Sequence, residues 1–188
     1  TFRATGAVAL PGGLRAHASF GEGVADPSFY DLYGYFPAYF IGNPDLVPET
    51  SRGWDAGLGW QMAVLSVDAT WFNTNLTNEI IGTYDFATGM AGAANASGES
   101  QRQGLELSAT LTPTEWLQIG GSYTYLDASE QQLAAGLRSR ELRRPKNSGA
   151  LSAQIAKGPW SAALALAFVG ARDDTDFTTF SRVPLPGY

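Results

Sequence analysis

Apolar and polar residues alternate one by one along most of this sequence, and this period of two constrains the fold more than any other feature. In the clearest segment, Leu105, Leu107, Ala109 and Leu111 alternate with Glu106, Ser108 and Thr110. Successive side chains of a β-strand point to opposite faces, so the pattern gives one apolar face and one polar face. No segment shows the spacing of three to four residues between apolar positions that an amphipathic helix would need. The alternation therefore predicts an all-β fold.

Eight segments carry the alternation, and the links between them are short and long in turn. Several segments approach the ~9 to 11 residues that a tilted transmembrane strand needs. The short links are 11–13, 61–62, 112–115 and 157–159, and the long ones are 23–50, 82–100, 128–145 and 171–188. This order is typical of an antiparallel meander that has short turns at one rim and long loops at the other. The predicted strands are Phe2–Leu10, Leu14–Glu22, Ser51–Trp60, Ala63–Ile81, Gln101–Leu111, Trp116–Asp127, Lys146–Ala156 and Trp160–Gly170.

The apolar face could meet lipid or a packed core. No run of about 18 apolar residues occurs, and the mean hydropathy is -0.11, so a membrane crossing would use strands rather than helices. Large aromatic residues are expected near strand ends, as in interfacial girdles. They are Trp54, Trp60, Trp71, Trp116, Tyr125 and Trp160. The opposite face of the last strand (Ser161, Ala163, Ala165, Ala167) would fill a soluble core poorly, which favours a membrane barrel over a soluble β-sandwich.

The composition excludes several classes of function. The chain has no cysteine, which excludes disulfide frameworks, thiolate metal sites and cysteine nucleophiles, and which suits export through an oxidising periplasm. The net charge of -6 provides no excess of basic residues for binding nucleic acid. Residues 1–10 lack the features of a signal peptide, so we expect any export signal to lie outside this chain.

The segment Ile41–Asp55 carries the most specific motif. It reads I-G-N-P-D-L-V-P-E-T-S-R-G-W-D. Its two prolines interrupt a β-ladder, and its Asn and Asp side chains favour local turns before a strand starts at Ser51. The motif resembles the signature with which TonB-dependent receptor barrels begin a strand after a long outer loop.

Further stretches are similar to the cobalamin-receptor branch of the same family. They are Ser28–Gly34, Gly104–Leu107, Leu142–Lys146 and Val169–Phe177. The resemblance runs over nearly the whole chain. Iron-siderophore receptors share the Asn-Pro-Asp-Leu and Arg-Arg-Pro elements, so a ferric-siderophore receptor remains the alternative within the class. A passive porin or a structural barrel is the alternative of another class.

The resemblance implies a 22-stranded outer-membrane barrel with an N-terminal plug, a plug segment that engages TonB, and ligand capture by plug apices and outer loops. We expect residues 1–188 to be part of that barrel domain, about eight strands, with the plug and the last strands outside this chain. The expected partners are cobalamin or a ferric siderophore, TonB through the plug, and outer-membrane lipid. Energised uptake of a large scarce nutrient is the expected function.

Four residues are the candidate ligand contacts. The resemblance places Arg143 where a guanidinium donates to amide and phosphate oxygens of a corrinoid, although a salt bridge to a lumen carboxylate such as Glu106 would also explain it. Phe177 stands where cobalamin receptors carry a ligand-touching tyrosine, so only apolar contact is expected. Tyr33 and Tyr35, with neighbouring loop aromatics, could hold a flat macrocycle or an aromatic siderophore, or pack within the loop.

We expect no enzyme, no cofactor and no metal site. His17 is the only histidine, and no acid or nucleophile stands at a recognisable spacing, so it is interpreted as a structural side chain of the lumen. Asp173, Asp174 and Asp176 supply oxygen ligands of the kind that calcium takes, but the glycine and distal glutamate of a dedicated loop are missing. In cobalamin receptors the calcium-binding aspartates lie on earlier loops, so these three are expected to be a solvated surface.

Overall fold

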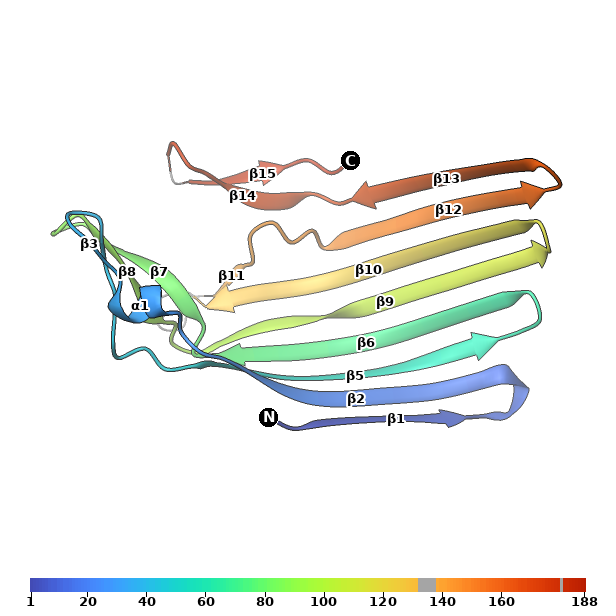
Figure 1. The fold of residues 1–188 in the computed structure, drawn as a ribbon, viewed down its shortest axis with the longest axis horizontal. Helices are drawn as coiled ribbons and strands as arrows, with labels where there is room; N and C mark the ends of the chain where they lie inside the picture. Colours follow the sequence, from blue (N-terminus) through green and yellow to red (C-terminus); the bar gives the residue numbers. More distant parts are fainter. Residues whose placement is uncertain (132–137, 180) are drawn as a thin grey trace.

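Eight long strands form one antiparallel meander. The computed structural model describes residues 1–131, 138–179 and 181–188, so residues 132–137 of the expected link 128–145 lie outside the described part. The eight strands pair strictly in chain order (Figure 1). They are β1 (Arg3–Ala9), β2 (Leu14–Ala25), β5 (Glu49–Gln61), β6 (Leu65–Thr77), β9 (Glu99–Thr114), β10 (Leu117–Gln131), β12 (Asn147–Lys157) and β13 (Trp160–Val169). The predicted all-β meander is confirmed.

The remaining elements are short. They are the 3₁₀ turn Pro11–Gly13, α1 (Phe29–Tyr33), β3 (Tyr35–Phe36), β4 (Phe40–Ile41), β7 (Ile80–Asp85), β8 (Met90–Asn95), β11 (Arg138–Arg140), β14 (Arg172–Asp176) and β15 (Ser181–Leu185). None of the short strands was predicted. None of the described helices is long and apolar enough to cross a membrane.

Two predicted boundaries are wrong. The segment Ala63–Ile81 is not one strand, because β6 ends at Thr77 and Asn78 adopts φ 56°, a left-handed conformation that breaks the ladder. β9 continues through the expected turn 112–115 as far as Thr114, and the β9–β10 register shifts between Leu117 and Ile119, as it does at a β-bulge.

The turn between β1 and β2 depends on two glycines. Gly12 and Gly13 have φ values of 76° and 79°, a region that strains other residues. A Cβ atom on Gly13 would also collide with the backbone carbonyl oxygen of Gln61. The end of β5 at Gln61 therefore lies so close that only glycine fits at position 13.

Register places the predicted apolar residues on one face of the sheet. Val67, Ala109, Gly121, Leu151 and Leu166 are successive cross-strand partners, and the next row on the other face contains Asp68, Ser108, Ser122, Ala150 and Ala167. The expected groups, Leu105, Leu107, Leu117, Ile119, Leu164, Leu166 and Phe168 against Glu106, Gln118, Ser122 and Gln154, fall on these two faces.

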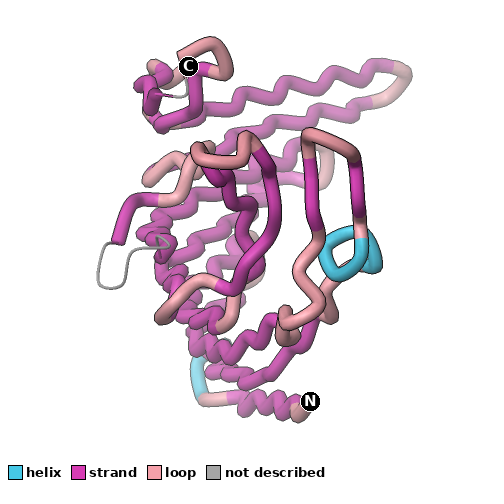
Figure 2. Tube along the Cα trace, turned by 90° about the vertical axis from the view of Figure 1, so that its left-hand side faces the viewer, coloured by secondary structure: helices cyan, strands magenta, loops and turns pink. Residues whose placement is uncertain are grey.

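Within the described residues, no other part of the protein packs against the apolar face. Leu166 is 58% exposed, and the buried apolar residues of the described chain are Leu46, Ala93, Ala96 and Ala128, which lie outside the apolar face of the eight strands. The eight strands follow a curved path, with β1 and β13 at its two ends (Figure 2). A soluble sandwich would need a second sheet packed on this face. A single curved sheet with an open apolar face suits a lipid contact instead.

The aromatic residues form two belts, only one of which lies at the strand ends. Trp60, Trp116 and Trp160 lie at the short-turn rim. Trp54, Trp71 and Tyr125 lie five or six residues before the loop-side ends Glu49, Thr77 and Gln131, so the expectation that they lie near strand ends is wrong. The nine steps from Trp116 to Tyr125 span about 30 Å along a strand, or about 23 Å of height at a tilt near 40°, whereas the six steps from Trp60 to Trp54 span about 20 Å, or about 15 Å of height. The strands thus extend beyond the upper belt.

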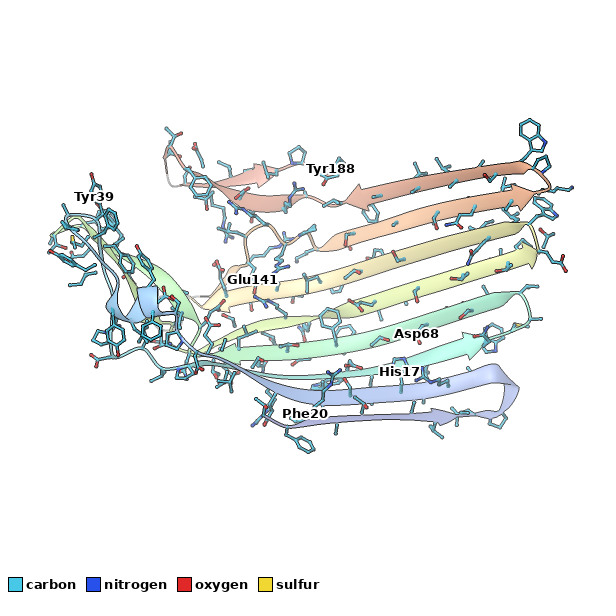
Figure 3. All side chains as sticks on the ribbon, viewed as in Figure 1. His17, Phe20, Tyr39, Asp68, Glu141 and Tyr188 are labelled. Carbon is cyan, nitrogen blue, oxygen red and sulfur yellow. The ribbon has the colours of Figure 1, made fainter. Side chains whose placement is uncertain are left out.

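The polar face carries a network around His17. Its Nε2 lies 3.0 Å from Asp68 Oδ2, and Thr70 Oγ1 donates to Asp68 Oδ1 over 2.8 Å. His17 is on β2 and Asp68 on β6, so the contact spans β5 (Figure 3). Gly57 of β5 leaves the space, because a Cβ there would approach the imidazole to 2.5 Å. The predicted structural histidine thus has an acid partner.

We predict that neighbouring positions of β10 meet different solvents. In the complete receptor made free of other cysteines, a water-soluble thiol reagent should modify Gln118→Cys and spare Ile119→Cys, because only the polar face borders water. Labelling of intact outer membranes measures this. Modification of position 119 with protection of position 118 would contradict the orientation.

A cation at the middle of the apolar face should destabilise the barrel. Leu166→Arg is expected to lower the free energy of unfolding by about 2 to 4 kcal/mol, the penalty for a basic side chain at the bilayer midplane. Ala165→Arg, its neighbour on the polar face, is the matched control and should cost less. Reversible unfolding of the complete receptor in lipid vesicles measures both, and equal losses would count against the assigned lipid face.

Candidate ligand-binding rim

The described parts of the long connections gather at one end of the sheet (Figure 1). The helix α1 and the strands β3, β4, β7, β8, β14 and β15 lie at this end, and the short turns lie at the other (Figure 1). The prediction of short turns at one rim and long loops at the other is therefore confirmed. We call the end with the long loops the loop rim. Loops held by a rigid scaffold are where binding residues concentrate.

The motif segment joins two of these loops into one unit. Phe40 of β4 pairs with Ala91 of β8, which links β3, β4, β8 and β7 in a four-stranded sheet. Asn43 donates from Nδ2 to the carbonyl oxygen of Ala93 over 3.1 Å, and its Oδ1 accepts the backbone N–H of Asp45 over 3.0 Å. The predicted Asx turn is confirmed. Leu46 of the same motif is buried.

The aromatic residues of this unit divide into packed and open side chains. Tyr30 stacks on Phe40 with ring centroids 4.3 Å apart, so these two serve loop packing. Tyr33 is 65% exposed and Tyr35 is 67% exposed. Tyr39 is also open and lies at the far end of the loops (Figure 3). Tyr33 and Tyr35 are thus available to a ligand.

Arg143 and Phe177, predicted from separate motifs, meet at another part of the loop rim. The guanidinium of Arg143 lies over the Phe177 ring, 5.7 Å from its centroid, within the range of a cation–π contact. Arg143 Nε donates to Asp174 Oδ1 over 2.7 Å. Its backbone, at φ 61°, donates to the carbonyl oxygen of Asp173 over 2.7 Å. The partner carboxylate is therefore Asp174, and the suggested pairing with Glu106 is wrong.

A buried carboxylate anchors the same loop to the wall of strands. Glu141 is only 5% exposed and accepts from Arg102 Nε of β9 over 2.7 Å and from Arg144 Nε over 3.2 Å. Two guanidinium groups offset the cost of burying one carboxylate. Arg182 of β15 adds an ion pair to Asp173 of β14 at 3.4 Å. Glu141 was not predicted from the sequence, although its place within a run of arginines was a usable signal.

The aspartates of the last loop are occupied by protein donors. The hydrogen bond from Arg143 is the main cause that lowers the pKa of Asp174, and the backbone N–H of Thr175 adds to it. Backbone and hydroxyl donors of Thr178 and Thr179 lower the pKa of Asp176. Within the described residues, no group of three His, Cys, Asp or Glu side chains could hold a metal ion. These aspartates remain partly exposed to solvent, and Asp173 and Asp174 are ion-paired there with Arg182 and Arg143.

The polar side chains around His17 on the barrel wall do not form the catalytic site of a hydrolase. His17 contacts Asp68, but the nearby hydroxyl of Ser19 donates to Asp55 rather than to the imidazole. A serine nucleophile needs its hydroxyl directed at the base. This network therefore fits a structural role in the lumen.

Comparison with known proteins decides the family. The model of the family described as "TonB dependent receptor-like, beta-barrel" matches residues 2–188. The chain belongs to this family. It is therefore part of a multi-pass protein of the outer membrane, and its family is a class of transport receptors rather than of enzymes.

The curated relatives differ in the ligand that their names give. The vitamin B12 transporter BtuB of Photobacterium profundum is 29% identical over 169 residues, which are 86% of this chain and 25% of that protein. The metal-pseudopaline receptor CntO of Pseudomonas aeruginosa is 32% identical over 107 residues, 55% of this chain and 14% of that protein. The chain thus spans a quarter or less of the length of these relatives.

Solved structures agree on the fold. The crystal structure of a mutant ferric enterobactin receptor from Pseudomonas aeruginosa, in complex with enterobactin, is similar with a TM-score of 0.77 at 15% identity. The match covers 98% of this chain and 31% of that chain. At this identity the likeness establishes the barrel wall and leaves the ligand open.

We predict that the Arg143–Asp174 pair persists to unusually low pH. A carboxyl group whose pKa is lowered by folding stabilises the fold above its ordinary pKa and loses that effect as the pH falls through the lowered value. A carbon-13 NMR titration of Asp174 in the complete receptor should give a midpoint below the ordinary value of 3.8. Arg143→Ala should move the midpoint up toward that value, and an unchanged midpoint would contradict the pairing.

Proposed function

We propose that this chain forms part of the wall and loop rim of a TonB-energised receptor that takes up cobalamin. The observation that carries the proposal is the meeting of Arg143 and Phe177 at the loop rim, because both were singled out from the cobalamin-receptor resemblance and come from different loops. The 29% identity to a vitamin B12 transporter supports the same ligand.

The proposed mechanism is not catalytic. Outer loops capture a large ligand, and energy delivered through TonB to a plug opens a path through the barrel. In this proposal residues 1–188 supply eight strands of a 22-stranded barrel, and the plug and the remaining strands belong to other parts of the protein. In the described sheet, β1 and β13 each pair with one strand only. This supports the proposal, since an edge strand in a membrane needs a partner for its backbone groups.

The chemistry of the Arg143 site suits a corrinoid. The Arg143 side chain is 59% exposed, and its described polar contact uses only Nε, which leaves the terminal nitrogens for amide and phosphate oxygens of a ligand. Phe177 is 70% exposed and offers an apolar ring beside them. A receptor with this pair would bind one charged or polar edge and one apolar surface of the same ligand.

A ferric siderophore is the second candidate, and the open aromatic residues are compatible with it. Tyr33 and Tyr35 could contact a flat aromatic ligand as readily as a macrocycle. The 32% identity to a metal-pseudopaline receptor supports a metal chelate. The family match speaks against a passive porin, which was the alternative of another class.

Removal of Arg143 should weaken cobalamin binding. We expect Arg143→Ala in the complete receptor to cost about 1.5 to 3 kcal/mol of binding free energy, the range for a hydrogen bond to a charged group. This corresponds to a rise in Kd of roughly tenfold to a hundredfold. Phe177→Tyr restores the hydroxyl of the family pattern and should tighten binding slightly. Isothermal titration calorimetry on purified receptor measures both.

A matched control distinguishes a direct contact between Arg143 and the ligand from an effect of Arg143 on the position of the loop. Asp174→Asn keeps the shape but removes the charge that competes for Arg143, so it should leave cobalamin affinity equal or higher. If Arg143→Ala and Asp174→Asn weaken binding equally, the arginine acts only by holding the loop. Wild-type receptor that binds a ferric siderophore and gives no heat with cobalamin would reject the cobalamin proposal but keep the receptor.

A further inference from the structure

Arg143 lies in a short loop that leaves the edge of β10 and rejoins it. The backbone N–H of Glu141 donates to the carbonyl oxygen of Ala128 over 3.1 Å, where the loop begins. The carbonyl oxygen of Lys146 accepts from the backbone N–H of Leu126 over 2.9 Å, where the loop ends. The residues between these two bonds lie outside the strands. Both ends of the loop are therefore fixed to β10, and Arg143 lies between them.

The backbone of Arg143 has a conformation that other contacts must hold. Its φ of 61° lies in the left-handed region, which residues with a Cβ atom rarely adopt. Such a conformation persists only where the surrounding structure imposes it. One contact of this kind is the hydrogen bond from the backbone N–H of Arg143 to the carbonyl oxygen of Asp173 over 2.7 Å. This bond holds Arg143 itself, so the residues on either side of it need contacts of their own.

Glu141 ties the loop on both sides of Arg143 to one point of the wall. It lies two residues before Arg143, and its carboxylate accepts over 3.2 Å from Arg144, the residue directly after it. The same carboxylate accepts from Arg102 of β9 over 2.7 Å. Glu141 and the adjacent Ala128 are buried, so little water competes for these bonds. Removal of the carboxylate would leave two guanidinium groups without their partner and would displace the loop.

We propose that Glu141 is a positioning residue of the ligand site and acts through Arg143. It fixes the loop in which the left-handed Arg143 directs its guanidinium at Asp174 and at the Phe177 ring. Glu141 itself is only 5% exposed, so it is assigned no contact with the ligand. The proposal rests on the proposed function in so far as Arg143 contacts the ligand, whereas the pairing of Arg143 with Asp174 can be measured without a ligand.

The first test is the carbon-13 NMR titration of Asp174 in the complete receptor without a ligand. The hydrogen bond from Arg143 is the main cause that lowers the pKa of Asp174, so the midpoint reports whether Arg143 is in place. Glu141→Ala should raise the midpoint toward the value of the Arg143→Ala variant. Glu141→Asp keeps the charge on a shorter side chain and should give an intermediate midpoint. A midpoint that Glu141→Ala leaves unchanged would overturn the proposal.

The second test is a double-mutant cycle on cobalamin affinity, measured by calorimetry on the complete receptor. Glu141→Ala alone should raise the Kd about two- to tenfold, the effect of weakening one hydrogen bond. In a receptor that already carries Arg143→Ala, the same change should have no further effect, because no guanidinium is left to position. An equal loss of affinity in both backgrounds would show that Glu141 acts without Arg143, and would reject the positioning role.

Glu22→Ala is the matched control. Glu22 of β2 also pairs with an arginine of a neighbouring strand, since it accepts from Arg52 Nη2 of β5 over 2.9 Å. Its removal should change neither the Asp174 midpoint nor the cobalamin affinity, and changes as large as those of Glu141→Ala would contradict a specific role. Resistance to heat-induced mobility change in gels shows that each variant is folded. A receptor that gives no heat with cobalamin would reject the cobalamin proposal, and the Asp174 midpoint would still decide the role of Glu141.

Discussion

The structure depends on one constraint: backbone N–H and C=O groups in hydrocarbon have no water to bond and must pair within the protein. Paired antiparallel strands meet this requirement, and their period of two then sends one row of side chains to lipid and the other to the lumen. The open apolar face with Leu166 and the face of small residues with Ala165 follow from it. In the described sheet β1 pairs only with β2 and β13 only with β12, so each of these edge strands has one open side.

The loop rim is held by different forces. Hydrogen bonds from Asn43 and apolar burial of Leu46 join two loops into one sheet. Ion pairs centred on Glu141 and Asp174 hold the loops that follow β10 and β13. Charged contacts of this kind exchange partners more readily than a packed core does, because a ligand with phosphate or amide oxygens can replace a carboxylate.

The sequence predicted the eight strands and their faces because alternation is a local property that each strand repeats. It failed at Asn78, since Ile80 and Ile81 continue an apolar pattern and only the left-handed backbone ends the strand. Arg143 and Phe177 were found through family motifs. Asp174, 31 positions from Arg143, and Asp68, 51 positions from His17, could not be recognised as their partners, because such pairings depend on register and loop approach rather than on spacing.

The most direct test of the membrane wall is quenching of tryptophan fluorescence by brominated lipids in the reconstituted complete receptor. Single-tryptophan variants would keep Trp54, keep Trp60, or place a tryptophan at Leu58 between them. Lipids brominated near the bilayer centre should quench Leu58→Trp most, and lipids brominated near the headgroups should quench Trp54 and Trp60 most. A Leu58→Trp fluorescence that neither lipid quenches, or that only a water-soluble quencher reduces, would contradict the account.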